Sequence, residues 1–166
     1  MENNQNQVPE SIWADGVVPE KVDPKFLFNM QELLLMSMDF IVRVFAPANG
    51  FKIDATNPDG KQLPNIIMSR DDKTYAIAVV PSVFPRGAVL RPDIKDQFYK
   101  KCQENNAIGV YMPVVLASRD EKRKAAGCLL KGDIYNIMFR GGVILDDNPN
   151  QDLKDPKNFY SFKKDE

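Results

Sequence analysis

The sequence of 166 residues contains no histidine. This absence excludes serine–histidine and cysteine–histidine catalysis, the common zinc sites, and imidazole proton transfer near neutral pH. The remaining routes to chemistry are carboxylates with magnesium or another hard cation, a lysine, or a cysteine without an imidazole partner. The two cysteines, Cys102 and Cys128, do not form a Cys-x-x-Cys motif. We therefore expect two small apolar residues in helices rather than a redox motif or a thiolate metal site.

An excess of charge of one sign is also missing. The chain has 22 Lys and Arg against 23 Asp and Glu, a formal net charge of -1. Proteins that bind nucleic acid usually carry a clear basic excess, because neutralising phosphates supplies much of the affinity. The densest basic segment, residues 119–131, contains acidic residues as well, and its pattern favours a solvated helix face over a nucleic-acid contact. Nucleic acid is therefore not favoured as a partner, although the net charge leaves room for a local basic patch.

Long apolar runs are absent. The run at residues 33–38 ends at Asp39, and it falls far short of the roughly 20 residues that a membrane helix needs. The first residues are polar and acidic, unlike a signal peptide. Hydrophobic residues make up 43% and charged residues 27%, a balance typical of a soluble globular domain. We expect one cytoplasmic domain that makes no contact with a membrane.

The apolar pattern predicts an α/β domain with a mixed central sheet flanked by helices. Asp23-Pro24 is a good helix start, and a 3.6-residue period continues to about Phe45. An antiparallel meander of three strands should follow, because two turn sequences separate three apolar runs. A helix crossover then makes the next strand parallel to the third one. The expected strands are 50–56, 63–69, 74–80, 107–117, 134–139 and 142–145, and the expected later helices are 92–105 and 120–130.

The chain divides into a polar N-terminal arm (1–22), one α/β domain (23–146) and a C-terminal tail (147–166). Both end segments carry aromatic residues: Trp13 in the arm, and Phe159, Tyr160 and Phe162 in the tail. Such side chains bury of order 150–250 Å² each when they are packed. We therefore expect contact with the body or with a partner to order at least one of the two ends.

The order of elements over residues 26–118, with Leu63-Pro64-Asn65 at a strand start, resembles the core of the PD-(D/E)XK nuclease-like fold. In active members of that family, an acid on the first helix joins an Asp at a strand start and a Glu-x-Lys triplet on the next strand. The carboxylates hold magnesium, which polarises the phosphate and activates water. The resemblance implies that Glu32 is the helix acid, Pro64-Asn65 the Pro-Asp pair, and Ala78-Val79-Val80 the triplet.

The chain departs from this pattern where the chemistry should be. Asn65 is neutral and offers one carbonyl oxygen, and neither Ala78 nor Val80 binds a metal or moves a proton. The alternative is a migrated magnesium site in which Glu32, Asp54 and Asn65 converge at one end of the sheet, with Glu32 and Asp54 as the metal ligands. The other acids near these strands, Asp59, Asp71 and Asp72, are expected to form turns.

These observations predict a non-catalytic binding or assembly protein on a nuclease-like scaffold with a degenerate active site. Its expected partner is another protein or a second copy of the chain, and it needs no cofactor. The alternative is a divergent magnesium-dependent nuclease that acts on DNA or RNA through Glu32, Asp54 and Asn65.

Overall fold

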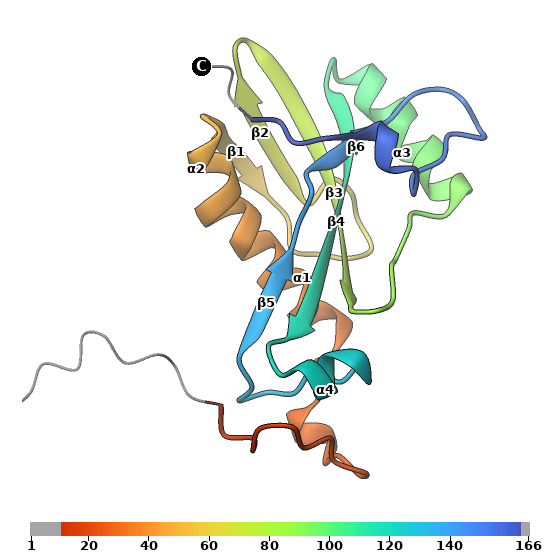
Figure 1. Ribbon diagram of the computed structural model, residues 1–166. Coiled ribbons are helices and arrows are strands. Elements are labelled where there is room, and N and C mark those ends of the chain that lie inside the picture. Colours follow the sequence, from red (N-terminus) through yellow and green to blue (C-terminus); the bar gives the residue numbers. More distant parts are fainter. Residues whose placement is uncertain (1–10, 164–166) are drawn as a thin grey trace, which may run out of the picture.

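The computed structural model describes residues 11–163; the first ten residues of the predicted arm and the last three of the tail lie outside the described residues. A mixed sheet forms the centre of the molecule, with strand order β1-β2-β3-β4-β6-β7 and with β5 also paired to β4 (Figure 1). The strands are β1 (Lys52–Thr56), β2 (Ile66–Arg70), β3 (Lys73–Val83), β4 (Ile108–Ser118), β5 (Tyr135–Met138), β6 (Gly142–Ile144) and β7 (Phe159–Tyr160). The helical elements are η1 (Pro24–Phe26), α1 (Met30–Phe40), the π-helical turn η2 (Ile41–Phe45), α2 (Ala46–Ala48), α3 (Pro92–Glu104), α4 (Glu121–Ala125) and η3 (Pro156–Asn158).

The strand pairing confirms the predicted mixed α/β sheet. β1, β2 and β3 form an antiparallel meander, and the tight turn between β2 and β3 places Asp71 and Asp72 at positive φ, which aspartate tolerates better than most residues. β3 then runs parallel to β4, in a register that extends from Tyr75 opposite Ile108 to Val83 opposite Leu116. The α3 crossover is what permits this parallel pairing.

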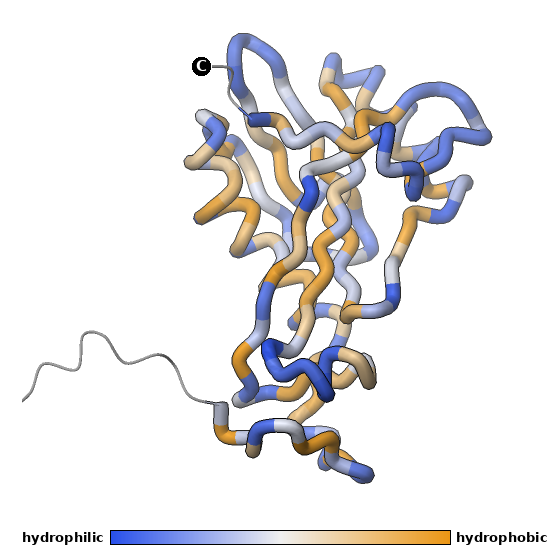
Figure 2. The backbone as a smooth tube through the Cα atoms, in the orientation of Figure 1, coloured by the Kyte–Doolittle hydropathy of each residue, from blue (hydrophilic) through white to orange (hydrophobic). Residues whose placement is uncertain are grey.

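Both faces of the central strands are buried, which explains why residues 74–80 have no polar alternation. On one face, Ile77 and Val79 of β3 pack with Leu34 and Ile41 of the first helix. On the other face, Ala78 of β3 belongs to a second cluster that includes Phe98 and Cys102 of α3. Figure 2 shows the corresponding apolar stretches along the strands and along the first helix, while the connecting turns are mostly hydrophilic.

The first helix does not begin where the sequence suggested. Asp23 caps only the short η1, by accepting a hydrogen bond from the N–H of Lys25. α1 begins at Met30, after a capping box in which Asn29 and Glu32 each accept a hydrogen bond from the other's backbone N–H. Between the two caps the chain is held extended by a β-bridge from Leu27 to Leu130. The sequence therefore contains two helix N-caps, Asp23 and Asn29. The longer helix begins at the second one because the bridge from Leu27 to Leu130 keeps the chain between them extended.

Two further helix bounds differ from the prediction. The first helix continues through η2 and α2 to Ala48, so Pro47 lies inside its last turns rather than beyond its end. The π-helical turn immediately precedes Pro47, whose nitrogen has no hydrogen to donate to the helix ladder. α4 spans Glu121–Ala125 and is shorter than the predicted 120–130, and Gly127 follows it at positive φ.

Both end segments contact the body, as their aromatic residues led us to expect. In the N-terminal segment, the indole N–H of Trp13 donates to the carbonyl of Lys131 at 2.9 Å. At the other end, β7 pairs with β6, and Phe162 is buried with Phe51 and Tyr75. The N-terminal segment lies beside α4 at one end of the molecule, and the C-terminal segment crosses near β6 at the other (Figure 1).

We predict that Gly141→Ala destabilises the protein by about 1–3 kcal/mol, because Gly141 has a φ of +94° and packs directly on β7. A Cβ at this position would clash with the carbonyl oxygen of Tyr160. The free energy of unfolding from urea titration measures the effect. Gly87→Ala is the matched control, since a Cβ there meets no atom within 4 Å. Equal stabilities of the two variants would contradict the prediction.

Candidate functional site

Asn65, which the predicted nuclease resemblance assigns to the position of the catalytic aspartate, is committed to the backbone of its neighbours. Its side chain is 1% exposed, and its Oδ1 accepts a hydrogen bond from the N–H of Val79 at 2.9 Å. Its Nδ2 donates to the carbonyls of Asn57 and Asp59, both at 3.3 Å. The side chain therefore extends the β2–β3 ladder past the last regular pair, Ile66 with Ile77, and fastens the turn before β2.

The two candidate acids have partners of their own. Glu32 accepts from the N–H of Asn29, and its Oε2 lies 2.7 Å from the Nζ of Lys131. The hydrogen bond from Lys131, followed by the one from Asn29, lowers the pKa of Glu32 below its ordinary value. Asp54 lies on β1 with its nearest cation, Lys52, at 4.0 Å. Within residues 11–163, no group of three or more His, Cys, Asp or Glu side chains is placed to hold a metal ion.

The remaining two nuclease positions are apolar and packed. Ala78 is completely buried, and Val80 is half-buried. Val79 and Val80 line an apolar groove of about 640 Å³ that also includes Leu34 of α1 and Ile94 of α3. Beside this groove β3 continues past the end of β2, and the buried Pro81 leaves no N–H to donate at that unpaired edge.

A buried ion cluster, which we name the Arg123 clamp, fastens the N-terminal segment. Arg123 is 1% exposed and forms a bidentate salt bridge with Asp133. Its Nε lies 2.7 Å from Oδ2, and its Nη2 lies 3.1 Å from Oδ1. Its Nη1 donates to the carbonyls of Ala14 and Val17. Asp120 accepts from the N–H of Gly16 at 2.6 Å. The clamp thus consists of Arg123, Asp120 and Asp133 and holds residues 14–17.

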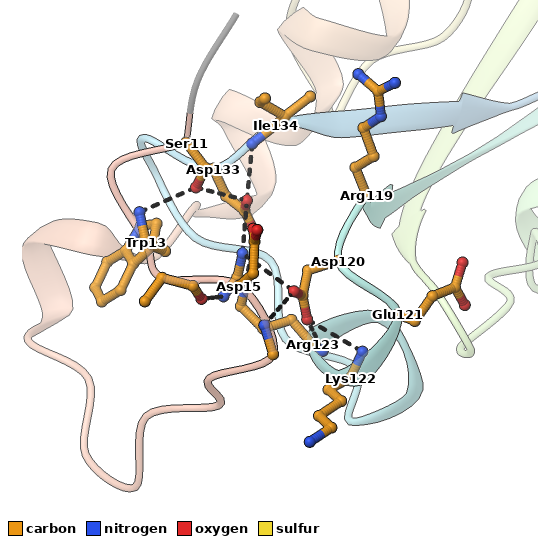
Figure 3. A pocket seen from close by; sticks show the side chains of 12 residues that line it. Ser11, Trp13, Asp15, Arg119, Asp120, Glu121, Lys122, Arg123, Asp133 and Ile134 are labelled. Carbon is orange, nitrogen blue, oxygen red and sulfur yellow. Dashed lines mark hydrogen bonds and ion pairs between the residues drawn. The ribbon is translucent and has the colours of Figure 1, made fainter.

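The clamp lies against a cavity of about 800 Å³. Figure 3 shows Arg123, Asp120 and Asp133 turned toward the N-terminal segment, while the side chains of Arg119 and Glu121 point away from this cluster. Two hydroxyls complete it, because Ser118 and Ser11 donate to Asp133 at 2.6 and 2.9 Å. These polar groups are satisfied inside the chain, so the arrangement fastens a segment rather than offering free ligands.

The clamp corrects our interpretation of the basic segment 119–131. Arg123 is neither on a solvated face nor available to nucleic acid, and Lys131 pairs with Glu32. The signal that would have identified the clamp is weak in the sequence, since Asp133 lies ten residues after Arg123 and opposite charges at that spacing are common. The cap at Asp120, which accepts from the N–H of Lys122 and Arg123, was the one local sign that this region is ordered.

The fold and these sites define an α/β protein with a mixed sheet and with no assembled carboxylate site among its described residues. Residues 31–144 match the model of a family described as Domain of unknown function (DUF8840), and the chain belongs to this family. Neither the curated proteins nor the solved structures contain a match to the chain. The likeness to the nuclease-like fold stays a prediction, and the function has to be inferred from the geometry.

We predict that Asn65→Asp, which introduces the acid expected from the nuclease resemblance, destabilises the fold by about 1–3 kcal/mol. A carboxylate would still accept from Val79, but it would face the carbonyls of Asn57 and Asp59 without a hydrogen to donate. Thermal melting at neutral pH measures the change. Asn136→Asp, at an exposed position on β5, is the control and should melt close to the original protein. If Asn65→Asp melted equally well, the packed role of Asn65 would be wrong.

We also predict that acid releases the N-terminal segment. Burial alone would raise the pKa of Asp133, but the hydrogen bonds from Arg123, Ser118 and Ser11 outweigh it and hold the pKa below its ordinary value. The N–H groups of Gly16 and Arg123 lower the pKa of Asp120. Carboxyls with a lowered folded pKa stabilise the docked form above their ordinary pKa of about 3.9, and this stability is lost as the pH falls further.

Trp13 is the single tryptophan and reports on this docking. Its fluorescence emission should shift to longer wavelength below about pH 4, while far-ultraviolet circular dichroism tests whether the sheet persists. Asp133→Asn should show the shifted emission already at pH 7, whereas Asp39→Asn, in an exposed pair with Arg43, should not. Unchanged Trp13 emission in Asp133→Asn would contradict the role of the clamp.

Proposed function

We propose that this chain is a non-catalytic binding or assembly protein built on a nuclease-like scaffold. The observation that carries the proposal is the use made of Asn65, whose amide is buried and bonded to three backbone groups. A residue so committed contributes to stability, and it has no carboxylate with which to hold magnesium. The buried Ala78 and half-buried Val80 support the same conclusion, because neither supports a nucleophile or a developing charge.

Cysteine chemistry does not replace the missing carboxylates. Cys102 of α3 is buried against β4, and burial raises the pKa of its thiol to about 11. Burial also raises the pKa of Cys128. Thiols of this kind carry little thiolate at neutral pH, and the thiolate is the nucleophile. Both cysteines are unpaired, which supports our proposal of a reducing, cytoplasmic location.

The proposed partner is another protein or a second copy of the chain, rather than nucleic acid. The near-zero net charge supports this choice, and so does the burial of Arg123 within its own clamp. Several large apolar side chains are exposed and available for such contacts: Ile12, Leu27, Met30, Leu35 and Val44. Among the described residues, no helix is long and apolar enough to cross a membrane.

We predict no metal-dependent cleavage of plasmid DNA, single-stranded DNA or RNA when the purified protein is incubated with magnesium or manganese. Magnesium should also leave the melting temperature unchanged, because Glu32 forms an ion pair with Lys131, whereas Asp54 forms a separate ion pair with Lys52. Gel electrophoresis of the substrates and a melting series over metal concentration measure the two outcomes.

The control separates this chain's activity from a contaminating nuclease. Asp54→Ala and Glu32→Gln would abolish a true magnesium-dependent activity, whereas a contaminant would persist in preparations of both variants. Cleavage that needs metal and disappears in Asp54→Ala would overturn the proposal in favour of the divergent nuclease.

A further inference from the structure

A second cavity, of about 530 Å³, lies on the sheet face that α3 only partly covers. Its floor is formed by Ser82 of β3 and by Pro113 and Val115 of β4, where Ser82 lies opposite Val115 in the parallel register. One wall is the connection after β3, residues 84–89, and the other is the C-terminal segment from Leu153 to Phe159. We name this space the Ser82 cavity. It is distinct from the Arg123 clamp and from the apolar groove beside Asn65.

Ser82 is the residue in this cavity that nothing inside the chain explains. Its side chain is 8% exposed, and its Oγ is the one buried side-chain oxygen or nitrogen among the described residues that has no hydrogen-bond partner. A buried hydroxyl without a partner lowers the stability of the fold. Ser82 lines the cavity although its Oγ is closed off from it, so a rotation of the side chain is needed for a bound molecule to supply the missing partner.

The rim of the Ser82 cavity is positively charged. Arg86, Arg140 and Lys154 line it, and no aspartate or glutamate does. Within residues 11–163, none of these three forms an ion pair, although ten ion pairs occur elsewhere in the same part of the chain. Arg140 instead lies over the ring of Phe159 at 5.0 Å, a position that leaves its N–H groups free to donate. The rim is therefore suited to an anion with more than one negative charge.

The walls of the Ser82 cavity are apolar and aromatic. Phe84, Val89 and Val115 line it together with Leu153 and Phe159. Surfaces of this kind favour a flat or aromatic group, and a cavity of this volume lies within the range of small-molecule sites. The combination of apolar walls, one buried hydroxyl and a basic rim is typical of a pocket that binds one molecule with an apolar ring at one end and an anionic group at the other.

The cavity is held open by contacts that do not involve a ligand. The hydroxyl of Tyr111 donates to the carbonyl of Ala88 and so fastens the 84–89 connection to the sheet. On the opposite wall, β7 is hydrogen-bonded to β6, which fixes Phe159 beside Val143. Leu153 is buried in the cluster that also contains Tyr111. A preformed pocket of this kind loses little conformational entropy when it binds its ligand.

We propose that the Ser82 cavity binds a small organic phosphate whose phosphomonoester is attached to a flat ring, as in a nucleoside monophosphate. The ring enters between the apolar walls, and a polar atom on its edge exchanges a hydrogen bond with the Ser82 hydroxyl once that side chain has rotated toward the cavity. The phosphate remains at the rim with Arg86, Arg140 and Lys154. A phosphomonoester carries about -1.5 to -2 charges near pH 7, which suits three cations better than a carboxylate does. This inference names a ligand class for the proposed binding function and rests on it.

Isothermal titration calorimetry with adenosine and uridine 5′-monophosphates tests the proposal with a purine and a pyrimidine probe. Adenosine, ribose 5-phosphate and inorganic phosphate supply the two halves of the ligand separately. We expect at least one monophosphate to bind at least tenfold more tightly than its nucleoside and than either phosphate lacking the ring. Absence of binding by both monophosphates, or equal binding of inorganic phosphate, would overturn the proposal.

Substitutions at the rim locate the site. Arg86→Gln and Lys154→Gln should each weaken binding of the monophosphate by about tenfold, since each removes a charge-assisted hydrogen bond. Neither side chain makes a hydrogen bond or ion pair among the described residues, so the fold should persist in both variants. Lys100→Gln, which removes an exposed lysine of α3 far from the cavity lining, is the matched control. Equal loss in all three variants would indicate non-specific attraction and contradict the site.

Ser82→Ala distinguishes a ligand contact from a packing role. In the free protein, the variant should melt at the same temperature as the original chain or higher, because it removes an unpaired buried hydroxyl. Its affinity for the monophosphate should nevertheless fall about tenfold. A lowered melting temperature with unchanged affinity would contradict the assignment. Cleavage assays report separately on the proposal that the chain is non-catalytic. Ligand binding without cleavage supports both that proposal and the assignment of the Ser82 cavity, whereas metal-dependent cleavage overturns only the non-catalytic proposal.

Discussion

The parallel pairing of β3 with β4 positions every candidate site in this protein. It joins Tyr75–Val83 to the strand that follows the α3 crossover, and both faces of the pair are buried, one against α1 and the other partly against α3. Because β3 is longer than β2, its last residues leave the meander at Asn65 and reach the Ser82 cavity on the far face. The same pair of strands therefore supports both the buried Asn65 site and the Ser82 cavity.

Three polar side chains illustrate how this fold handles buried hydrogen-bonding groups. Asn65 replaces a missing strand partner and has all of its polar atoms engaged. Arg123 is neutralised by Asp133 and satisfied by two carbonyls of the N-terminal segment, which is what makes its burial tolerable. Ser82 has no such partner. The contrast is the reason to assign structural roles to the first two and a ligand to the third.

The strands were predictable because their apolar runs and turn residues are local signals. The Asn57-Pro58-Asp59-Gly60 and Asp71-Asp72 turns, and the uninterrupted apolar run 74–80, were enough to place the meander and its parallel neighbour. The start of the first helix was not predictable from capping preference alone, because Asp23 and Asn29 both cap well and the bridge from Leu27 to Leu130 decided between them. Contacts over a hundred residues leave no local trace in the sequence.

The sequence by itself determined the α/β class and the absence of histidine chemistry, since each follows from residue identity and spacing. It also indicated that the aromatic ends would find contacts, because such side chains are costly to expose. Only the tertiary structure decided that Arg123 is buried beside Asp133, and that Arg86, Arg140 and Lys154 surround one cavity. Those groups come from segments far apart in the chain, and the distance between two charges in space depends on the folded backbone rather than on their order.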